Sequence, residues 1–268
     1  MRAAIVRSAI IALAATVSVS CVIPLMINDD PWWGRSAATF RRVVPLDPGG
    51  ALVLENDTGD VEIRGWDRSE VEVSAEEGWG RLSRPGFGFG GWGRASSPDI
   101  GVDKIENLVK IAVRAPGRVD IGRPVHFEVN VPRSITIRSI GLKTGDLALA
   151  DLFGKIKADV EDGDVRIVNF SGSVDLLAGR GRVEVELLDL RAEDEVLLTV
   201  KEGDLTVYPQ PDANARIEAS APNGEIVSEF DLGTEPPSKK AAGDIGKSGG
   251  ATLSLTAFRG DVHLKKSR

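Results

Sequence analysis

A glycine–aspartate pair that returns along the chain with similar flanks constrains the fold more than any other feature of the sequence. Where the series is densest, the step from Gly145 to Gly163 equals the step from Gly163 to Gly181. The next two steps are slightly longer, and the step from Gly224 to Gly260 is twice the step from Gly145 to Gly163. Self-similarity with a period of about 20 residues is typical of repeat architectures. Within the series that shares these flanks, five positions carry the full pair and two keep the glycine before another residue: Gly59-Asp60, Gly145-Asp146, Gly163-Asp164, Gly203-Asp204, Gly260-Asp261, Gly181-Arg182 and Gly224-Glu225.

Apolar residues alternate with polar ones on both sides of these glycines. Before Gly163, for example, Ile156, Ala158 and Val160 lie two residues apart, and Val165 resumes the alternation after it. Alternation at period two predicts half-buried strands. Glycine supplies the backbone freedom that a corner needs, and aspartate can satisfy turn amides. Since no helical stripe follows the N-terminal segment, the sequence predicts an all-β fold.

The near-constant step favours one kind of all-β fold. A unit whose side chains lie on those of the unit below must keep its length, so the spacing predicts a β-solenoid, or β-helix-like, series of about 20-residue units. Small residues before the turns fit a narrow interior; they are Ala158, Ala178, Ala219 and Ala257. A β-sandwich with Greek-key connections is the structural alternative.

Two segments carry a family resemblance. Residues 52–67, which open the series, and residues 129–134, which lead into its dense part, resemble the bacterial DUF4097 family of putative adhesins. The resemblance extends from about residue 44 to the end of the chain and implies a β-solenoid protein of the cell envelope. It brings no catalytic residues with it.

The amino terminus has the pattern of an export signal. Arg2 and Arg7 precede an uncharged stretch, 8–28, and Asp29 follows it directly. Such a segment is a secretory signal or an uncleaved anchor. Three outcomes are compatible with it: a lipoprotein acylated at Cys21, a membrane-spanning anchor, since about 20 residues cross the hydrocarbon core, or a cleaved, soluble product. We therefore expect an exported, envelope-located protein, membrane-anchored and periplasmic or surface-facing.

The remaining boundaries follow from composition. Residues 1–28 are assigned to the signal or anchor, 29–43 to a linker and 44–268 to the repeat domain. Two interruptions lie inside the domain: a glycine-rich segment, 79–98, and a segment predicted as a flexible loop, 233–250. The first offers aromatic side chains either to a partner surface or to the domain itself; they are Trp79, Phe87, Phe89 and Trp92.

Charge and composition exclude several functions. A formal charge of −7 disfavours nucleic acid as a partner, because phosphate backbones require clustered Lys and Arg. With one cysteine and two widely separated histidines, His126 and His263, the sequence indicates no metal site and no cofactor. The repeated aspartates could form an acidic row that binds calcium, but we expect them to cap turn amides instead.

Two functional hypotheses remain. The first is a non-catalytic binding, adhesin-like or scaffold module that contacts an envelope or cell-surface partner. The second is a carbohydrate-active β-helix enzyme, a lyase or hydrolase, that uses the turn carboxylates Glu161, Asp162 and Asp164. An acidic corner row open to water favours the first, and a carboxylate pair in a groove beside aromatic side chains favours the second. The sequence favours a protein that is not an enzyme.

Overall fold

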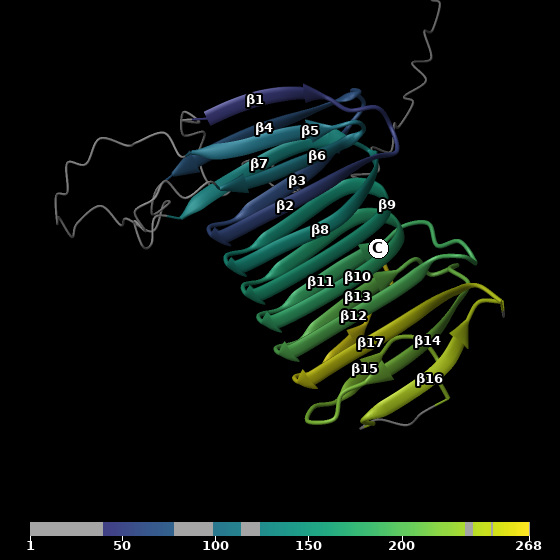
Figure 1. The fold of residues 1–268 in the computed structure, drawn as a ribbon. Coiled ribbons are helices and arrows are strands. Elements are labelled where there is room, and N and C mark those ends of the chain that lie inside the picture. Colours follow the sequence, from purple (N-terminus) through teal and green to yellow (C-terminus); the bar gives the residue numbers. More distant parts are fainter. Residues whose placement is uncertain (1–39, 78–98, 114–123, 234–237, 248, 268) are drawn as a thin grey trace, which may run out of the picture. The chain divides into compact units, whose positions relative to one another are not determined.

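The computed structural model describes residues 40–77, 99–113, 124–233, 238–247 and 249–267 (Figure 1). Over these ranges the chain forms one open, 18-stranded sheet and no helix, which confirms the all-β prediction. The described residues accordingly include no helix that is long and apolar enough to cross a membrane.

The strands differ widely in length, from three to sixteen residues. In chain order they are β1 (Phe40–Pro45), β2 (Gly50–Thr58), β3 (Val61–Trp66), β4 (Glu70–Glu77), β5 (Ile100–Ile105), β6 (Leu108–Val113), β7 (Val125–Pro132), β8 (Ser134–Thr144), β9 (Leu147–Asp162), β10 (Val165–Arg180), β11 (Val183–Leu187), β12 (Glu195–Glu202), β13 (Leu205–Pro209), β14 (Ala215–Ser220), β15 (Ile226–Ser228), β16 (Lys240–Ile245), β17 (Ala251–Arg259) and β18 (Val262–Leu264).

Parallel pairing between neighbouring units organises the sheet. β9 and β10 pair along nearly their whole length, from Leu147 beside Val165 to Asp162 beside Arg180, at one constant offset that equals the step from Gly145 to Gly163. Each of these long strands contains one non-glycine residue with a positive φ angle about a third of the way along, Asp151 in β9 and Asn169 in β10. The repeat period of the sequence is therefore the register of the sheet.

Each unit has two arms, which meet at a repeat glycine. We call the strand segments before the glycine the leading arm and those after it the trailing arm. Across the leading arms the order is β5, β6, β2, β8, β9, β10, β12, β17, β14, β16. Across the trailing arms it is β1, β4, β7, β3, β9, β10, β11, β13, β18, β15. Antiparallel pairs occur only towards the ends of these two orders.

The order of units in space departs from the order in the chain at both ends. β2 and β3 lie between β6 and β7 on one side and β8 and β9 on the other. Likewise, the last two strands, β17 and β18, lie between β12 and β13 and the earlier β14 and β15. Figure 1 shows β17 between β12 and β14. The last strands of the described chain are thus internal to the sheet.

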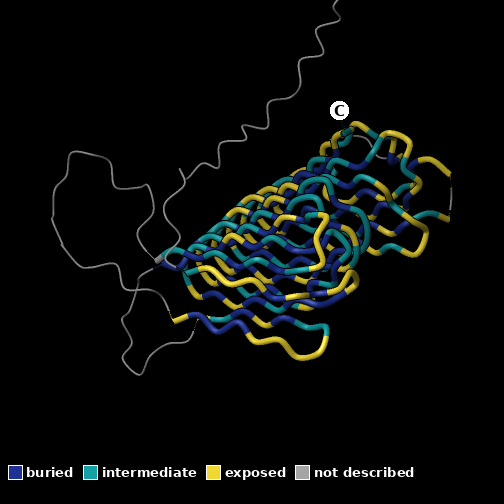
Figure 2. The backbone as a smooth tube through the Cα atoms, turned by 90° about the horizontal axis from the view of Figure 1, so that it is seen from above, coloured by how far each residue is buried: buried dark blue, intermediate teal, exposed yellow. Residues whose placement is uncertain are grey.

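Alternating side chains form the core. Within β9 the predicted residues Ile156, Ala158 and Val160 are buried, while the residues between them are exposed. Figure 2 shows this alternation of buried and exposed positions along the strands. The small residues predicted to line the interior are buried as well: Ala158, Ala178, Ala219 and Ala257.

Two predicted boundaries differ from the structure. β1 begins at Phe40, inside the range assigned to the linker, and pairs with β4. Within the predicted loop 233–250, residues 240–245 form β16, which pairs with β14. Its alanines and glycine are poor strand formers, so the local sequence carries little strand signal there. Residues 1–39 and 78–98 lie outside the described ranges.

Candidate functional site

Close contact between neighbouring turns explains the glycine of each unit. Gly163 has a φ of 154°, and a Cβ atom at this position would overlap the carbonyl oxygen of Gly145 in the neighbouring turn. Gly181 is placed in the same way on Gly163, and Gly203 on Gly181. Only glycine combines a positive φ with this approach of two backbones. The turns therefore form a continuous corner with no room for side chains at these positions.

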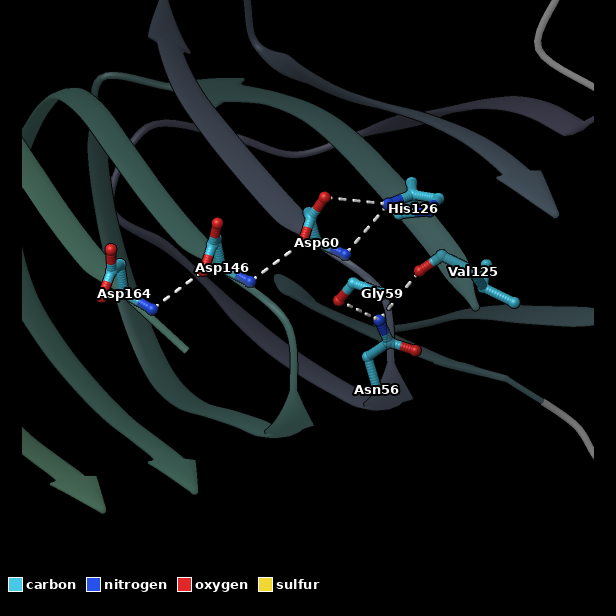
Figure 3. A network of polar contacts seen from close by, with 7 residues as sticks. All are labelled: Asn56, Gly59, Asp60, Val125, His126, Asp146 and Asp164. Carbon is cyan, nitrogen blue, oxygen red and sulfur yellow. Dashed lines mark hydrogen bonds and ion pairs between the residues drawn. The ribbon is translucent and has the colours of Figure 1, made fainter. Parts of the chain in front are cut away.

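The repeated aspartates join the turns to one another (Figure 3). Oδ1 of Asp60 accepts a hydrogen bond from the backbone nitrogen of Asp146 at 2.9 Å, and Oδ1 of Asp146 accepts one from Asp164 at 2.8 Å. Oδ1 of Asp164 in turn accepts a hydrogen bond from the backbone nitrogen of Arg182 at 2.7 Å. Hydrogen bonds to an ionised carboxylate are stronger than neutral ones. The prediction that aspartate caps turn amides is confirmed, and the amide belongs to the neighbouring unit.

The series is interrupted once and then resumes. Arg182 has no carboxylate with which to accept a bond from the next turn. Beyond it, Oδ1 of Asp204 accepts from the backbone nitrogen of Asp261 at 2.9 Å, and Oδ1 of Asp261 accepts from that of Glu225 at 2.8 Å. Each donor belongs to the unit farther from β1 in the sheet order. We call these five aspartates, Asp60, Asp146, Asp164, Asp204 and Asp261, the turn ladder.

A histidine and an asparagine join β7 to the first turn of the ladder. Nδ1 of His126 lies 3.1 Å from both the backbone nitrogen and Oδ2 of Asp60. The neutral ring can accept from the amide through an unprotonated Nδ1, whereas an Nδ1–H would donate to the carboxylate. Nδ2 of Asn56, buried at 4% exposure, donates to the carbonyl oxygens of Gly59 and Val125 at 3.0 and 2.9 Å (Figure 3).

The carboxylates of this corner titrate differently. The hydrogen bond with His126 is the largest cause that lowers the pKa of Asp60, against the opposing effect of burial. Burial raises the pKa of Asp146, and the neighbouring carboxylates of Asp60 and Asp164 add to the rise. On β3, burial raises the pKa of Glu62, which Glu128 reinforces and the Arg64 guanidinium opposes. Burial therefore opposes ionisation of all three carboxylates, and at Asp60 the hydrogen bond with His126 outweighs it.

Charges of alternating sign precede the repeat glycines in four consecutive units. Nη1 of Arg180 lies 3.5 Å from Oδ2 of Asp162, and its Nε lies 3.9 Å from Oε2 of Glu202. Nη1 of Arg259 in turn contacts Oε1 of Glu202. Exposed pairs of this kind contribute about 0–1 kcal/mol each. Their sign pattern nevertheless favours β17, which carries Arg259, as the neighbour of β12.

The carboxylates considered for catalysis lie at an exposed corner. Asp162 pairs with Arg180, and Oδ2 of Asp164 lies 3.5 Å from Nη2 of Arg182. The side chains of both aspartates are 50% exposed, and Glu161 is exposed as well. This is the acidic corner row open to water that the sequence associates with a binding module. Within the described ranges no three His, Cys, Asp or Glu side chains gather as a metal site.

Some predicted site residues cannot be placed. The candidate lipidation site, Cys21, and the candidate interaction residues Trp79, Phe87, Phe89 and Trp92 lie outside the described residues. His126 is half-buried on β7.

Sequence reasoning missed Asn56. The signal was present: three residues before a repeat glycine the other units carry an apolar residue, such as Leu142 or Val160, and this unit carries an amide. A polar residue at an otherwise apolar repeat position indicates a buried hydrogen bond.

No family model matches this sequence, and no curated protein matches it. Solved structures do resemble it. One, a putative cell adhesion protein from Clostridium sporogenes, is 14% identical, with a TM-score of 0.47 over 85% of this chain and 99% of that one. Two are putative adhesins. The one from Bacteroides fragilis is 8% identical, with a TM-score of 0.31 over 84% and 96%. The one from Parabacteroides merdae is 9% identical, with a TM-score of 0.26 over 85% and 96%.

Proposed function

We propose that this chain is an exported, envelope-tethered β-solenoid that acts as a non-catalytic, adhesin-like binding or scaffold module. The turn ladder supports this more than any other observation. Its five carboxylates each accept a hydrogen bond from the next turn, and they include Asp164, one of the three carboxylates considered for a carbohydrate-active enzyme. The repeated acid is thereby used to hold units together, and the outer faces of the two arms are the surfaces that can meet a partner.

Pairing supports the solenoid form. Both arms of β9 pair in parallel with the same neighbour, β10, at one constant offset. Most strand pairs of the series are likewise parallel, whereas the Greek-key connections of a sandwich join antiparallel strands. A solenoid offers extended flat surfaces, which suits binding to large partners.

The tether is proposed from the sequence. An uncharged stretch behind Arg2 and Arg7 would direct export, and Cys21 would carry the lipid. Acyl chains bind membranes through burial of their methylene groups, and a single chain binds only marginally. An envelope or cell-surface partner would then be met by the repeat domain outside the cytoplasm.

The binding function is tested on whole cells that produce the full chain. Cells carrying the wild type should be retained on immobilised cell-envelope material, and cells carrying an empty vector should not. Purified protein should release no sugar from the same material. Sugar release that disappears in Asp164→Asn would replace the binding function with the enzymatic one.

The tether is tested separately by metabolic labelling with a palmitate analogue. Wild type should be labelled and found in the membrane fraction, and Cys21→Ser should lose both properties. Unlabelled wild type in the membrane fraction would point to the anchor instead, and unlabelled soluble wild type to cleavage.

A further inference from the structure

β16 is the outermost described strand of the leading arms, at the end of the sheet farthest from β5 (Figure 1). It pairs with β14, and its other edge meets no strand among the residues that the structure describes. An open edge presents backbone N–H and C=O groups that can pair with a further strand. This edge is therefore a candidate docking surface, and its chemistry indicates the occupant.

Alternate residues supply the backbone groups of the open edge. The backbone nitrogen of Ala221 donates to the carbonyl oxygen of Lys239, so this pair of β14 and β16 is a hydrogen-bonded one. Hydrogen-bonded pairs alternate with non-hydrogen-bonded ones in an antiparallel ladder. The residues of β16 whose N–H and C=O groups point away from β14 are therefore Lys240, Ala242 and Asp244.

Two of these three residues keep their edge groups available. Within the described ranges, no hydrogen bond reaches the outward N–H and C=O groups of Ala242 or Asp244. The hydroxyl of Ser238 bonds both backbone groups of Lys240. A carbonyl oxygen has two lone pairs, so the oxygen of Lys240 can accept a second bond. The edge thus offers donors and acceptors over its whole length.

The side chains of the same three residues lie on the outer face. Ala241 and Ile245, between and beyond them, are buried, whereas Lys240, Ala242 and Asp244 are exposed. Lys240 forms no ion pair with any other described residue. Asp244 lies opposite an arginine of β14, with a long contact of 3.7 Å between Oδ1 and a guanidinium nitrogen. The edge therefore carries one positive and one negative charge, with a small residue midway between them.

A second copy of β16 fits this edge in one register. When two copies continue one sheet with their core faces on the same side, a two-fold axis must pass through a residue, because adjacent side chains point to opposite faces. An axis through Ala242 places Lys240 of each copy opposite Asp244 of the other. An axis through Ala241 or Gly243 brings no opposite charges together. Ala242 then lies opposite itself, where its small side chain avoids a clash.

The other outermost described strands lack this match. On β1 the charged residues are Arg41 and Arg42, so two copies would bring like charges together. On β5, Asp103 and Lys104 are adjacent and point to opposite faces, so the same condition keeps them from lying opposite each other. β15 has three residues and no charge. Charge-matched self-pairing is therefore particular to β16.

We propose that two copies of this chain associate through β16, antiparallel about a two-fold axis at Ala242, and so join their leading-arm sheets into one. Opposite charges facing each other across a strand pair stabilise it, and a two-fold axis forms the pair of Lys240 with Asp244 twice. Lysine on an edge strand ordinarily discourages pairing, but here an acid faces it. The inference goes beyond the proposed binding function and does not depend on it.

A disulfide at the axis tests the register. Opposite residues in a hydrogen-bonded antiparallel pair have Cα atoms about 5.5 Å apart, which is within disulfide range. In cells that produce the full chain, Ala242→Cys should form a disulfide-linked dimer under mild oxidation, seen on non-reducing gels. Wild type, whose one cysteine is Cys21, gives the background.

The matched control lies one strand further in. Glu218 on β14 is exposed and in register with Ala242. Two copies of residue 218 would be three strand spacings, about 14 Å, apart across the axis, so Glu218→Cys should give no more dimer than wild type.

Charge variants in the Ala242→Cys background test the pairing itself. Lys240→Asp should slow the formation of the linked dimer about tenfold, because two like-charged pairs replace two opposite ones. Asp244→Lys should do the same. Production of the two variants in one cell should restore a linked heterodimer, in which both pairs are again complementary. Equal thermal midpoints of the purified variants show that the fold is retained.

Three results would overturn the inference. They are a level of dimer in Ala242→Cys no higher than in wild type, an equal level in Glu218→Cys, and linkage that Lys240→Asp leaves unchanged. Retention of cells on envelope material tests the binding function independently, so a failure of either proposal can be told from a failure of the other.

Discussion

The carboxylate oxygen Oδ1 of Asp146 lies 2.8 Å from the backbone nitrogen of Asp164, one unit along the sheet. The two residues are 18 positions apart, which is the period of the repeat and the register of β9 with β10. The same carboxylate oxygen accepts the same kind of bond in two further units: Asp60 accepts from the backbone nitrogen of Asp146, and Asp204 accepts from that of Asp261. Repetition of an acidic residue in this sequence is thus a consequence of repetition of a hydrogen bond.

Two substitutions of Asp146 should distinguish the contribution of its hydrogen bond to stability from the contribution of its charge. Asp146→Ala should lower the free energy of unfolding by about 1–2 kcal/mol, because the amide of Asp164 loses its acceptor. Asp146→Asn keeps an acceptor oxygen without the charge whose burial raises the pKa of Asp146, so its change should stay within about 0.5 kcal/mol. Urea denaturation measures both. Glu161→Ala, at a nearby exposed carboxylate, is the control, and a loss equal to that of Asp146→Ala would contradict the ladder.

Two glycines of the leading arms and turns should respond oppositely to alanine. Gly163→Ala places a Cβ on the carbonyl oxygen of Gly145 at a φ of 154°, and should lower the free energy of unfolding by more than about 3 kcal/mol or prevent folding. Gly141 on β8 has open space around the Cβ position and no positive φ. Gly141→Ala should be neutral or stabilising by up to about 1 kcal/mol. Similar losses in both variants would show that close contact between turns is not the reason for the glycine.

Acid should weaken the contribution of Asp60. Because its folded-state pKa lies below the ordinary value of 3.8, Asp60 stabilises the fold above that pH, and the effect is lost as the pH falls through the lowered pKa. The difference in unfolding free energy between wild type and Asp60→Asn should therefore have its largest value near about pH 5.5 and become smaller as the pH falls towards about 2.5. Asp146 and Glu62, with raised pKa values, act in the opposite sense. Glu62 is unaffected by Asp60→Asn, whereas the rise at Asp146 becomes smaller because the Asp60 charge contributes to it.

A double substitution identifies the cause of that pH dependence. The contact with His126 is the largest influence on the pKa of Asp60. In a His126→Gln background, Asp60→Asn should therefore change the pH dependence of unfolding less than it does alone. An undiminished effect would assign the lowered pKa to the amide of Asp146 instead.

Local pattern was enough to predict most strands but not their neighbours. The alternation of Ile156, Ala158 and Val160 predicts the leading arm of β9, and the structure buries all three. The turn glycines and the capping role of aspartate also follow from residue chemistry. The order of units at the two ends does not, because the pairing of Val196 with Leu253 joins residues that are remote in the chain and whose local patterns match those of every other unit. The opposite charges of Arg259 and Glu202 are a sequence feature that agrees with this arrangement.

The same limit applies to the candidate sites. The turn ladder recurs in five of the seven glycine turns and is visible in the sequence, whereas the common face of β10, β11, β13 and β18 exists only because these strands become neighbours. Glu184 and His263 are remote in sequence and occupy the same repeat position, three residues after Gly181 and Gly260, but the repeat alone does not indicate which units lie side by side. Their common face is a product of register, which the sequence indicated only for the units that follow one another at a constant step.

Proline substitutions can test the unusual position of β17. Ser254 on β17 and Ala242 on β16 both pair with Glu218 of β14, but β17 has a second neighbour, β12, while β16 is paired with β14 alone among the described strands. The backbone nitrogen of Ala221 donates to the carbonyl oxygen of Lys239. Since hydrogen-bonded pairs alternate in an antiparallel ladder, the amide of Ala242 points away from β14.

Ser254→Pro should therefore be severe and Ala242→Pro mild. Proline at 254 removes a ladder donor inside the sheet and should cost about 3 kcal/mol or more, whereas at 242 it removes no bond to β14, and edge strands tolerate proline. Thermal and urea unfolding of the two variants measure the difference. If β17 were instead the outermost strand, as a series stacked in chain order would have it, Ser254→Pro would be the milder substitution and its effect would be confined to fraying of the last residues. A large loss of stability in Ser254→Pro together with a small loss in Ala242→Pro would place β17 inside the sheet, between β12 and β14.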